Sequence, residues 1–179
     1  MSSPRRVAVL GIGNVLLGDD ALGPYVIKLL EAAWAPQDGL QLVDAGTPGL
    51  DLTAYLAEHD AVVVVDVVKA SGAPGEVRLY GKAELVERPP VLALSPHEPG
   101  LREAILNADF LEVSPGSVRL VGVIPESVEY RLGLSGPVKA ALPLVLERIR
   151  HELAAVGVTP AARPEPLPPD LWWEREAGA

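Results

Sequence analysis

Four side chains in this sequence could act together on a metal ion or a bound substrate. Asp19 and Asp20 are adjacent carboxylates that follow a short apolar run and a glycine-bearing turn. Asp66 interrupts a run of valines, and His97 follows a proline in residues 95–100. Carboxylate oxygens and an imidazole nitrogen form a mixed ligand set that suits nickel, zinc, iron or manganese. Three protein ligands leave coordination positions open for a substrate.

Each of these residues also has an interpretation that involves no chemistry. One of the two adjacent aspartates is positioned to cap the helix that is predicted to follow them. Asp66 could accept a structural hydrogen bond, because burying a carboxylate without a partner costs several kcal/mol. A single histidine in a loop, such as His97, is more often solvent-facing or bonded to the backbone than a ligand. His59 and His151 are expected on helix surfaces.

Alternating strands and helices are expected to position these residues. Continuous apolar runs predict buried strands, and apolar residues at helical spacing predict helices between them. The predicted strands are residues 7–10, 40–44, 61–68, 76–80 and 118–124. The predicted helices are residues 21–34, 50–58, 100–107 and one that begins after Ser135. This order indicates an α/β fold with helices on both faces of the sheet.

The carboxyl ends of the strands are predicted to gather the candidate residues. Right-handed crossovers between parallel strands bring these ends to one edge of a sheet. That edge should receive residues 11–20, 44–47, 66–69 and 125–126. The segment 76–80 alternates in hydrophobicity, so we expect it to form an edge strand with one exposed face.

The composition restricts the class of protein. Of 179 residues, 49% are hydrophobic and only 4% are aromatic, so a single domain with an aliphatic core is expected. With 15 basic and 24 acidic residues the net charge is −9, which argues against nucleic acid or an anionic membrane as partner. There is no cysteine, and no apolar run approaches the roughly 20 residues that span a bilayer. We expect a soluble, cytoplasmic protein.

A change in composition divides the chain near residue 157. Residues 1–156 are expected to form a single α/β domain. Residues 160–169 are rich in proline, and Leu171-Trp172-Trp173 follow them. We expect residues 157–179 to form a tail that is extended over the domain or disordered.

Several common activities are disfavoured by the sequence. Gly11 and Gly13 match the start of a dinucleotide-binding fingerprint, but Leu16 stands where its third glycine is required. The Asp19-Asp20 pair would repel a pyrophosphate at the start of the helix. The sequence has no Walker A lysine, no cysteine nucleophile, no nucleophile-elbow serine and no His-Glu-x-x-His zinc helix.

Five blocks of the sequence, in order, closely resemble the NiFe hydrogenase maturation endopeptidase family. The blocks are GIGNVLLGDDALGP at residues 11–24, DAGTPGLDL at 44–52, VVVVDVV at 62–68, SPHEPGL at 95–101 and VGVIPESVEYRLGLS at 121–135. The likeness covers residues 7–153. It implies a three-layer α/β/α fold of the phosphorylase/hydrolase-like type, with a mixed, mostly parallel five-stranded sheet.

The resemblance also implies an activity. Family members are endopeptidases that remove the C-terminal extension of the hydrogenase large-subunit precursor after nickel insertion. The implied metal ligands and catalytic residues are Asp20, Asp66 and His97, and the first of these is Glu in some relatives. The implied metal is nickel, delivered by the precursor, although zinc or cadmium are other divalent ions that such a site accepts. The implied enzyme is an aspartic-type or metal-dependent peptide hydrolase, and we expect it to be a monomer.

A function from a different class stays open at this stage. A nickel-handling chaperone would bind the large-subunit precursor without cutting it. The two functions differ in whether the mass of a nickel-loaded precursor changes on incubation with the protein.

Overall fold

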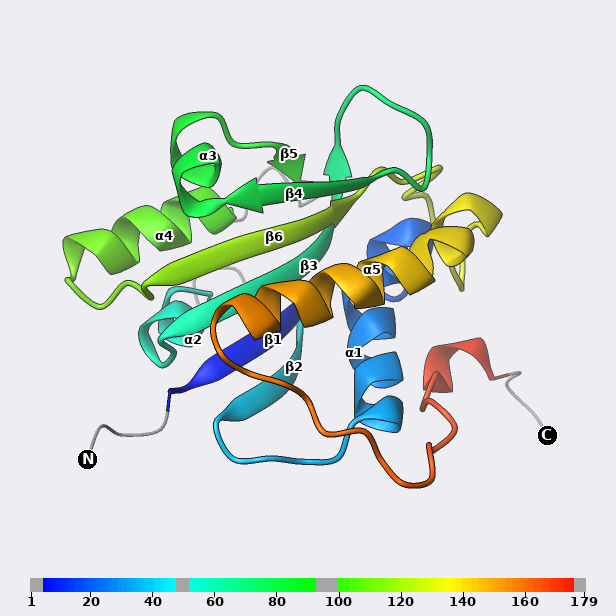
Figure 1. Cartoon of the computed structure of the whole chain (residues 1–179). Helices are drawn as coiled ribbons and strands as arrows, with labels where there is room; N and C mark the ends of the chain where they lie inside the picture. The colour runs from blue at the N-terminus through cyan, green and yellow to red at the C-terminus, as the bar shows by residue number, and fades with distance from the viewer. Residues whose placement is uncertain (1–4, 48–51, 93–99, 176–179) are drawn as a thin grey trace.

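Helices cover both faces of a central sheet in the computed structural model, which describes residues 5–47, 52–92 and 100–175 (Figure 1). The strands are β1 (Val7–Ile12), β2 (Leu40–Gly46), β3 (Ala61–Lys69), β4 (Val77–Gly81), β5 (Val91–Leu92) and β6 (Ser117–Val123). The helices are α1 (Leu22–Ala33), α2 (Leu52–Ala57), α3 (Lys82–Glu87), α4 (Leu101–Phe110) and α5 (Gly136–Ala155), with short 3-10 helices η1 (Gly18–Ala21) and η3 (Trp172–Glu174). The three-layer α/β/α fold expected from the sequence is confirmed.

The sheet is mixed and mostly parallel, as predicted. Its main strands follow the order β2-β1-β3-β6-β4. The first four are parallel to their neighbours, and β4 is antiparallel to β6 at the edge. The edge strand predicted at residues 76–80 is therefore confirmed. The two-residue strand β5 pairs antiparallel with the end of β3, and neither β5 nor α3 was expected from the sequence.

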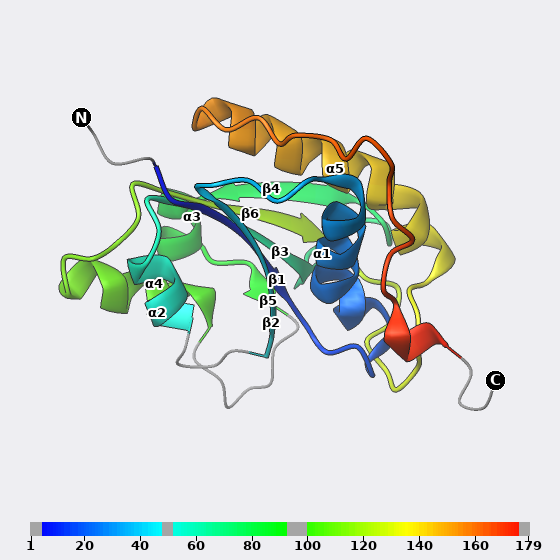
Figure 2. The same cartoon turned by 90° about the horizontal axis from the view of Figure 1, so that it is seen from below.

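Two hydrophobic clusters, one on each face of the sheet, form the core. One cluster lies under α1 and α5, and the other lies under α2, α3 and α4 (Figure 2). In β3, Val63 and Val65 belong to the first cluster, whereas Val62 and Val64 belong to the second. Because β3 is covered on both faces, its sequence is a continuous run of valines rather than an alternating pattern.

The described part of the tail runs back along α1 (Figure 2). Backbone hydrogen bonds join Arg163 N to Ala33 O at 2.8 Å and Leu167 N to Ala32 O at 2.9 Å. Trp173 is only 3% exposed, and its ring lies 6.4 Å from that of Tyr25 between centroids. Residues 157–175 thus lie over the domain. Within the described ranges, no helix has both the length and the apolar character needed to cross a bilayer.

Candidate functional site

The loops that follow β1 and β6 lie side by side at the carboxyl edge of the sheet. Strands β2, β1, β3 and β6 are parallel, so their carboxyl ends share this edge. Gly18 N donates to Arg131 O at 2.8 Å, and Asp19 N donates to Ser127 O at 3.0 Å. The backbone therefore joins the segment that carries Asp19 and Asp20 to residues 126–135.

Glycines allow β1, η1 and α1 to approach one another closely. A Cβ atom on Gly23 would lie 2.2 Å from Ile12 O, and one on Gly11 would lie 2.3 Å from Gly23 O. Gly13 has a φ of +143°, and a Cβ there would lie 1.7 Å from Asp20 O. The glycines of the first sequence block thus seat Asp20 directly against the end of β1. Close backbone packing accounts for them without a phosphate ligand.

Asp19 is a fully buried carboxylate that holds the loop after β6. Its Oδ1 atom accepts a hydrogen bond from Ser135 N at 2.6 Å. Its Oδ2 atom accepts hydrogen bonds from Glu126 N at 2.8 Å, Ser127 N at 3.2 Å and Ser135 Oγ at 2.9 Å. Ser135 in turn is the N-cap of α5, as the sequence predicted, and its Oγ accepts from Val138 N. Asp19 therefore acts as a structural residue.

The predicted helix cap by Asp19 or Asp20 is wrong. The cap position of η1 is Leu17 and that of α1 is Ala21, and neither helix has a side-chain cap hydrogen bond. Asp19 bonds instead to Ser135, which lies 116 residues later in the chain. The chain turns through η1 before α1 begins, which carries both aspartates away from the α1 cap position.

Asp20 and Asp66 are buried carboxylates, and the charge of Asp20 acts on Asp66. Asp20 is 6% exposed, and its Oδ2 atom accepts from Asn14 N at 2.8 Å. Asp66 is 1% exposed, and its Oδ1 atom accepts from Val67 N at 2.7 Å. Burial, and secondly the charge of Asp20, raise the pKa of Asp66 well above its usual range. The neutral form of the Asp66 carboxyl is therefore favoured while nothing else is bound.

A cation fits these two side chains. Among the described residues, no hydrogen-bond donor reaches Asp66 Oδ2, which is buried. A buried carboxylate oxygen without a donor is stabilised by a metal ion, and oxygen ligands of this kind bind divalent ions. The third predicted ligand, His97, lies outside the described residues. Within the part of the chain that the structure describes, no group of three His, Cys, Asp or Glu side chains is placed to hold a metal ion.

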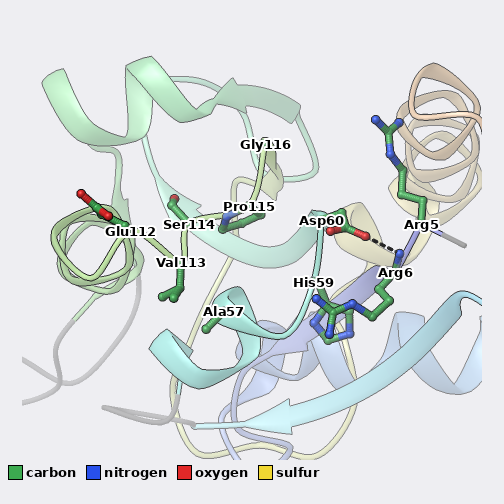
Figure 3. A pocket seen from close by; sticks show the side chains of 10 residues that line it. All are labelled: Arg5, Arg6, Ala57, His59, Asp60, Glu112, Val113, Ser114, Pro115 and Gly116. Carbon is green, nitrogen blue, oxygen red and sulfur yellow. Dashed lines mark hydrogen bonds between the residues drawn. The ribbon is translucent and has the colours of Figure 1, made fainter. Parts of the chain in front are cut away.

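A separate cavity, whose lining residues are drawn in Figure 3, lies where β1, β3 and β6 begin, at the opposite end of these parallel strands from the carboxylates. Its volume is about 840 Å³, and its lining includes Arg6, His59 and Asp60. The expectation that His59 lies on a helix surface is wrong, because it is 4% exposed. Its Nδ1 lies 2.7 Å from Tyr55 O and its Nε2 lies 3.1 Å from Gln41 Oε1, so both ring nitrogens have partners. Because the cavity lies at the start of the strands, it is separate from Asp20 and Asp66, which lie toward their carboxyl ends.

Comparisons with known proteins agree with the fold. The sequence profile described as "Hydrogenase maturation protease" matches residues 24–152. The Hydrogenase 2 maturation protease of Escherichia coli K12 is 34% identical over 157 residues, covering 86% of this chain and 93% of that protein. The hydrogenase expression/formation protein HupD of Rhizobium leguminosarum bv. viciae is 32% identical over 161 residues, covering 89% and 80%.

Solved structures show the same architecture. The hydrogenase maturating endopeptidase HybD from E. coli superposes with a TM-score of 0.77 at 32% identity, covering 88% of this chain and 98% of that one. The fold is that of an α/β/α protein with a mixed, mostly parallel sheet. The chain belongs to the hydrogenase maturation protease family, and the resemblance seen in the five sequence blocks is confirmed.

Proposed function

We propose that this protein is an endopeptidase that removes the C-terminal extension of a NiFe hydrogenase large-subunit precursor after nickel has been inserted. The observation that carries the proposal is the buried pair of Asp20 and Asp66 at the sheet edge of a maturation protease. The charge of Asp20, after burial, raises the pKa of Asp66, which supports a shared site. The relatives are named as hydrogenase proteases, which supports the hydrogenase precursor as the substrate.

Nickel belongs to the substrate in this proposal, as an ion already bound by the precursor. Asp20, Asp66 and His97 bind it through its open coordination positions and so recognise a loaded precursor. Because the metal-free Asp66 carboxyl favours its protonated form, binding of a cation displaces that proton. The resting protein therefore has little affinity for a free ion, and zinc or cadmium enter the site only when supplied in excess.

The reaction is hydrolysis of one peptide bond. The water oxygen bonds to the carbonyl carbon, the C–N bond breaks, and a proton from the water reaches the leaving amine through a carboxylate. Either the ion or one of the two aspartates activates the water, which corresponds to a metal-dependent or an aspartic-type peptidase. Docking of the nickel holds the scissile bond beside these groups, and such positioning lowers the barrier by several kcal/mol.

The partner in this proposal is the large-subunit precursor in the cytoplasm. One copy of the chain supplies all three proposed ligands, so a monomer is sufficient for the reaction. No second subunit is needed to complete the site.

Cleavage assays with two precursor preparations test the proposal. Wild-type protein is incubated with nickel-loaded and nickel-free precursor, and the mass of the precursor is measured. We expect loss of the extension from the nickel-loaded form only, and no loss with the His97→Ala variant. The exposed His151 on α5 provides the matched control, since His151→Ala should cleave normally. Normal processing by His97→Ala would remove His97 from the mechanism, and binding without any mass change would favour the chaperone.

A further inference from the structure

Exposed apolar side chains lie on the loops after β1 and β6 and on the tail segment η3. Exposed hydrophobic side chains that gather in one patch mark a contact surface, whereas single scattered ones are ordinary. Tyr130 is 79% exposed and Trp172 is 57% exposed. We call the set of four residues the apolar rim: Leu16, Tyr130, Leu132 and Trp172.

The apolar rim is continuous with the segment after β1 that carries Asp20. Arg131 N, between Tyr130 and Leu132, donates to Leu16 O at 3.0 Å. Leu16 lies four residues before Asp20, in the segment that Asp19 joins to residues 126–135 by hydrogen bonds. A peptide that approaches Asp20 from the side of this segment would contact the rim.

Trp172, the fourth residue of the apolar rim, comes from η3 in the C-terminal tail. A Cβ on Gly133 would lie 2.9 Å from Glu174 Oε1, so η3 contacts the loop after β6 directly beside Leu132. In Figure 2, η3 at the red end of the chain lies next to this loop and to the start of α1. The tail extends beyond residue 152, where the match to the family profile ends.

Burial of Trp173 fixes η3 while leaving its neighbour exposed. Trp173 belongs to the core cluster that includes Tyr25 and Leu134. The rings of Trp172 and Trp173 meet edge to face, with 5.6 Å between centroids and 86° between planes. One tryptophan therefore anchors the segment and the other is held at the surface in a defined orientation. A pre-ordered aromatic side chain binds a partner at low conformational-entropy cost.

We propose that the apolar rim is the docking surface for the hydrogenase large-subunit precursor, and that the C-terminal tail supplies Trp172 to it. The inference rests on the proposed function, because the occupant is the substrate of the neighbouring site. Continuity of the rim with the loop of Asp20 favours the precursor over a second copy of this chain. Aromatic side chains dominate the binding energy of such surfaces.

The test measures kcat, KM and the Kd for nickel-loaded precursor in the variants Tyr130→Ala and Trp172→Ala. Each variant should raise KM and Kd roughly tenfold, as the loss of an aromatic interface residue does, with kcat unchanged. The matched control is Phe110→Ala, since Phe110 is 87% exposed at the far end of α4. That control should leave all three constants at wild-type values. Unfolding midpoints equal to wild type show that the variants keep the fold.

The possible outcomes are distinct. Unchanged KM and Kd in both rim variants would overturn the docking surface, even if the wild-type protein cleaves the precursor. Loss of self-association in the rim variants, seen by sedimentation without any change in Kd, would assign the rim to a second copy and also overturn it. If the wild-type protein binds the precursor without cleaving it, the proposed function fails. The rim is then judged on the Kd values alone.

Discussion

Replacement of Asp19 by Asn tests whether its carboxylate holds the loop after β6. The carboxylate accepts four hydrogen bonds: one at Oδ1 from Ser135 N, and three at Oδ2. Asparagine has the same shape but only one acceptor oxygen. If that oxygen replaces Oδ2, the amide NH₂ faces the Ser135 N–H, 2.6 Å from Oδ1 in the native protein. Two donors would then meet inside the core.

The expected change in the free energy of unfolding follows from these hydrogen bonds. A hydrogen bond to a charged group contributes about 1.5–3 kcal/mol, and a buried donor left without an acceptor costs about 1–3 kcal/mol. We therefore expect Asp19→Asn to lower the free energy of unfolding by about 3 kcal/mol. Urea unfolding followed by tryptophan fluorescence measures this change. The slope of the unfolding free energy against urea concentration should equal that of the wild-type protein.

The control for this substitution is Asp170→Asn in the tail. Asp170 forms an exposed ion pair with Arg175, and such pairs contribute little to stability. Its variant should unfold with wild-type stability. If Asp19→Asn were no less stable than Asp170→Asn, Asp19 would not be the structural support of the loop, and its assignment as a non-ligand would lose its basis.

Two further predictions concern stability. The pKa of Asp66 is higher in the folded protein than in the unfolded chain. Protonated Asp66 therefore adds to the free energy of unfolding at low pH, and this contribution is lost as the pH rises from the unfolded pKa through the folded pKa. Asp66→Asn should lack this loss, so its unfolding free energy relative to wild type should rise between pH 4 and pH 8, and parallel pH curves would refute the buried acid. Gly23→Ala places a Cβ against backbone atoms of Ile12 and should cost about 2 kcal/mol in thermal or urea unfolding. Gly136→Ala, with nothing within 4 Å of the new atom, should be neutral or slightly stabilising, and equal effects at the two glycines would contradict the close packing.

The sheet could be predicted from the sequence because its strands are strongly apolar. The valines of β3 are buried on both faces of the sheet, and a continuous apolar run of this kind is typical of a central parallel strand. The short elements were missed for a physical reason. Helix α3 has six residues and buries only Leu85, and β5 has two residues, so neither produces a periodic signal.

The candidate site could be predicted only in part. Asp66 is conspicuous in the sequence because a charged residue among valines requires a specific partner. Asp20 could not be separated from Asp19 by local pattern, because the contacts that distinguish them come from Ser127 and Ser135, over 100 residues away in the chain. The role of the tail was also hidden, since nothing in Leu171-Trp172-Trp173 indicates which tryptophan is buried.

In the proposed function, Asp20 and Asp66 recognise the metal of the precursor before the peptide bond is cut. The most direct test of this recognition is the mass of a large-subunit precursor, with and without bound nickel, after incubation with the wild-type protein and with Asp66→Asn. We predict that only the wild-type protein shortens the precursor, and only when nickel is present. Equal shortening of the nickel-free precursor, or full activity of Asp66→Asn, would contradict the claim.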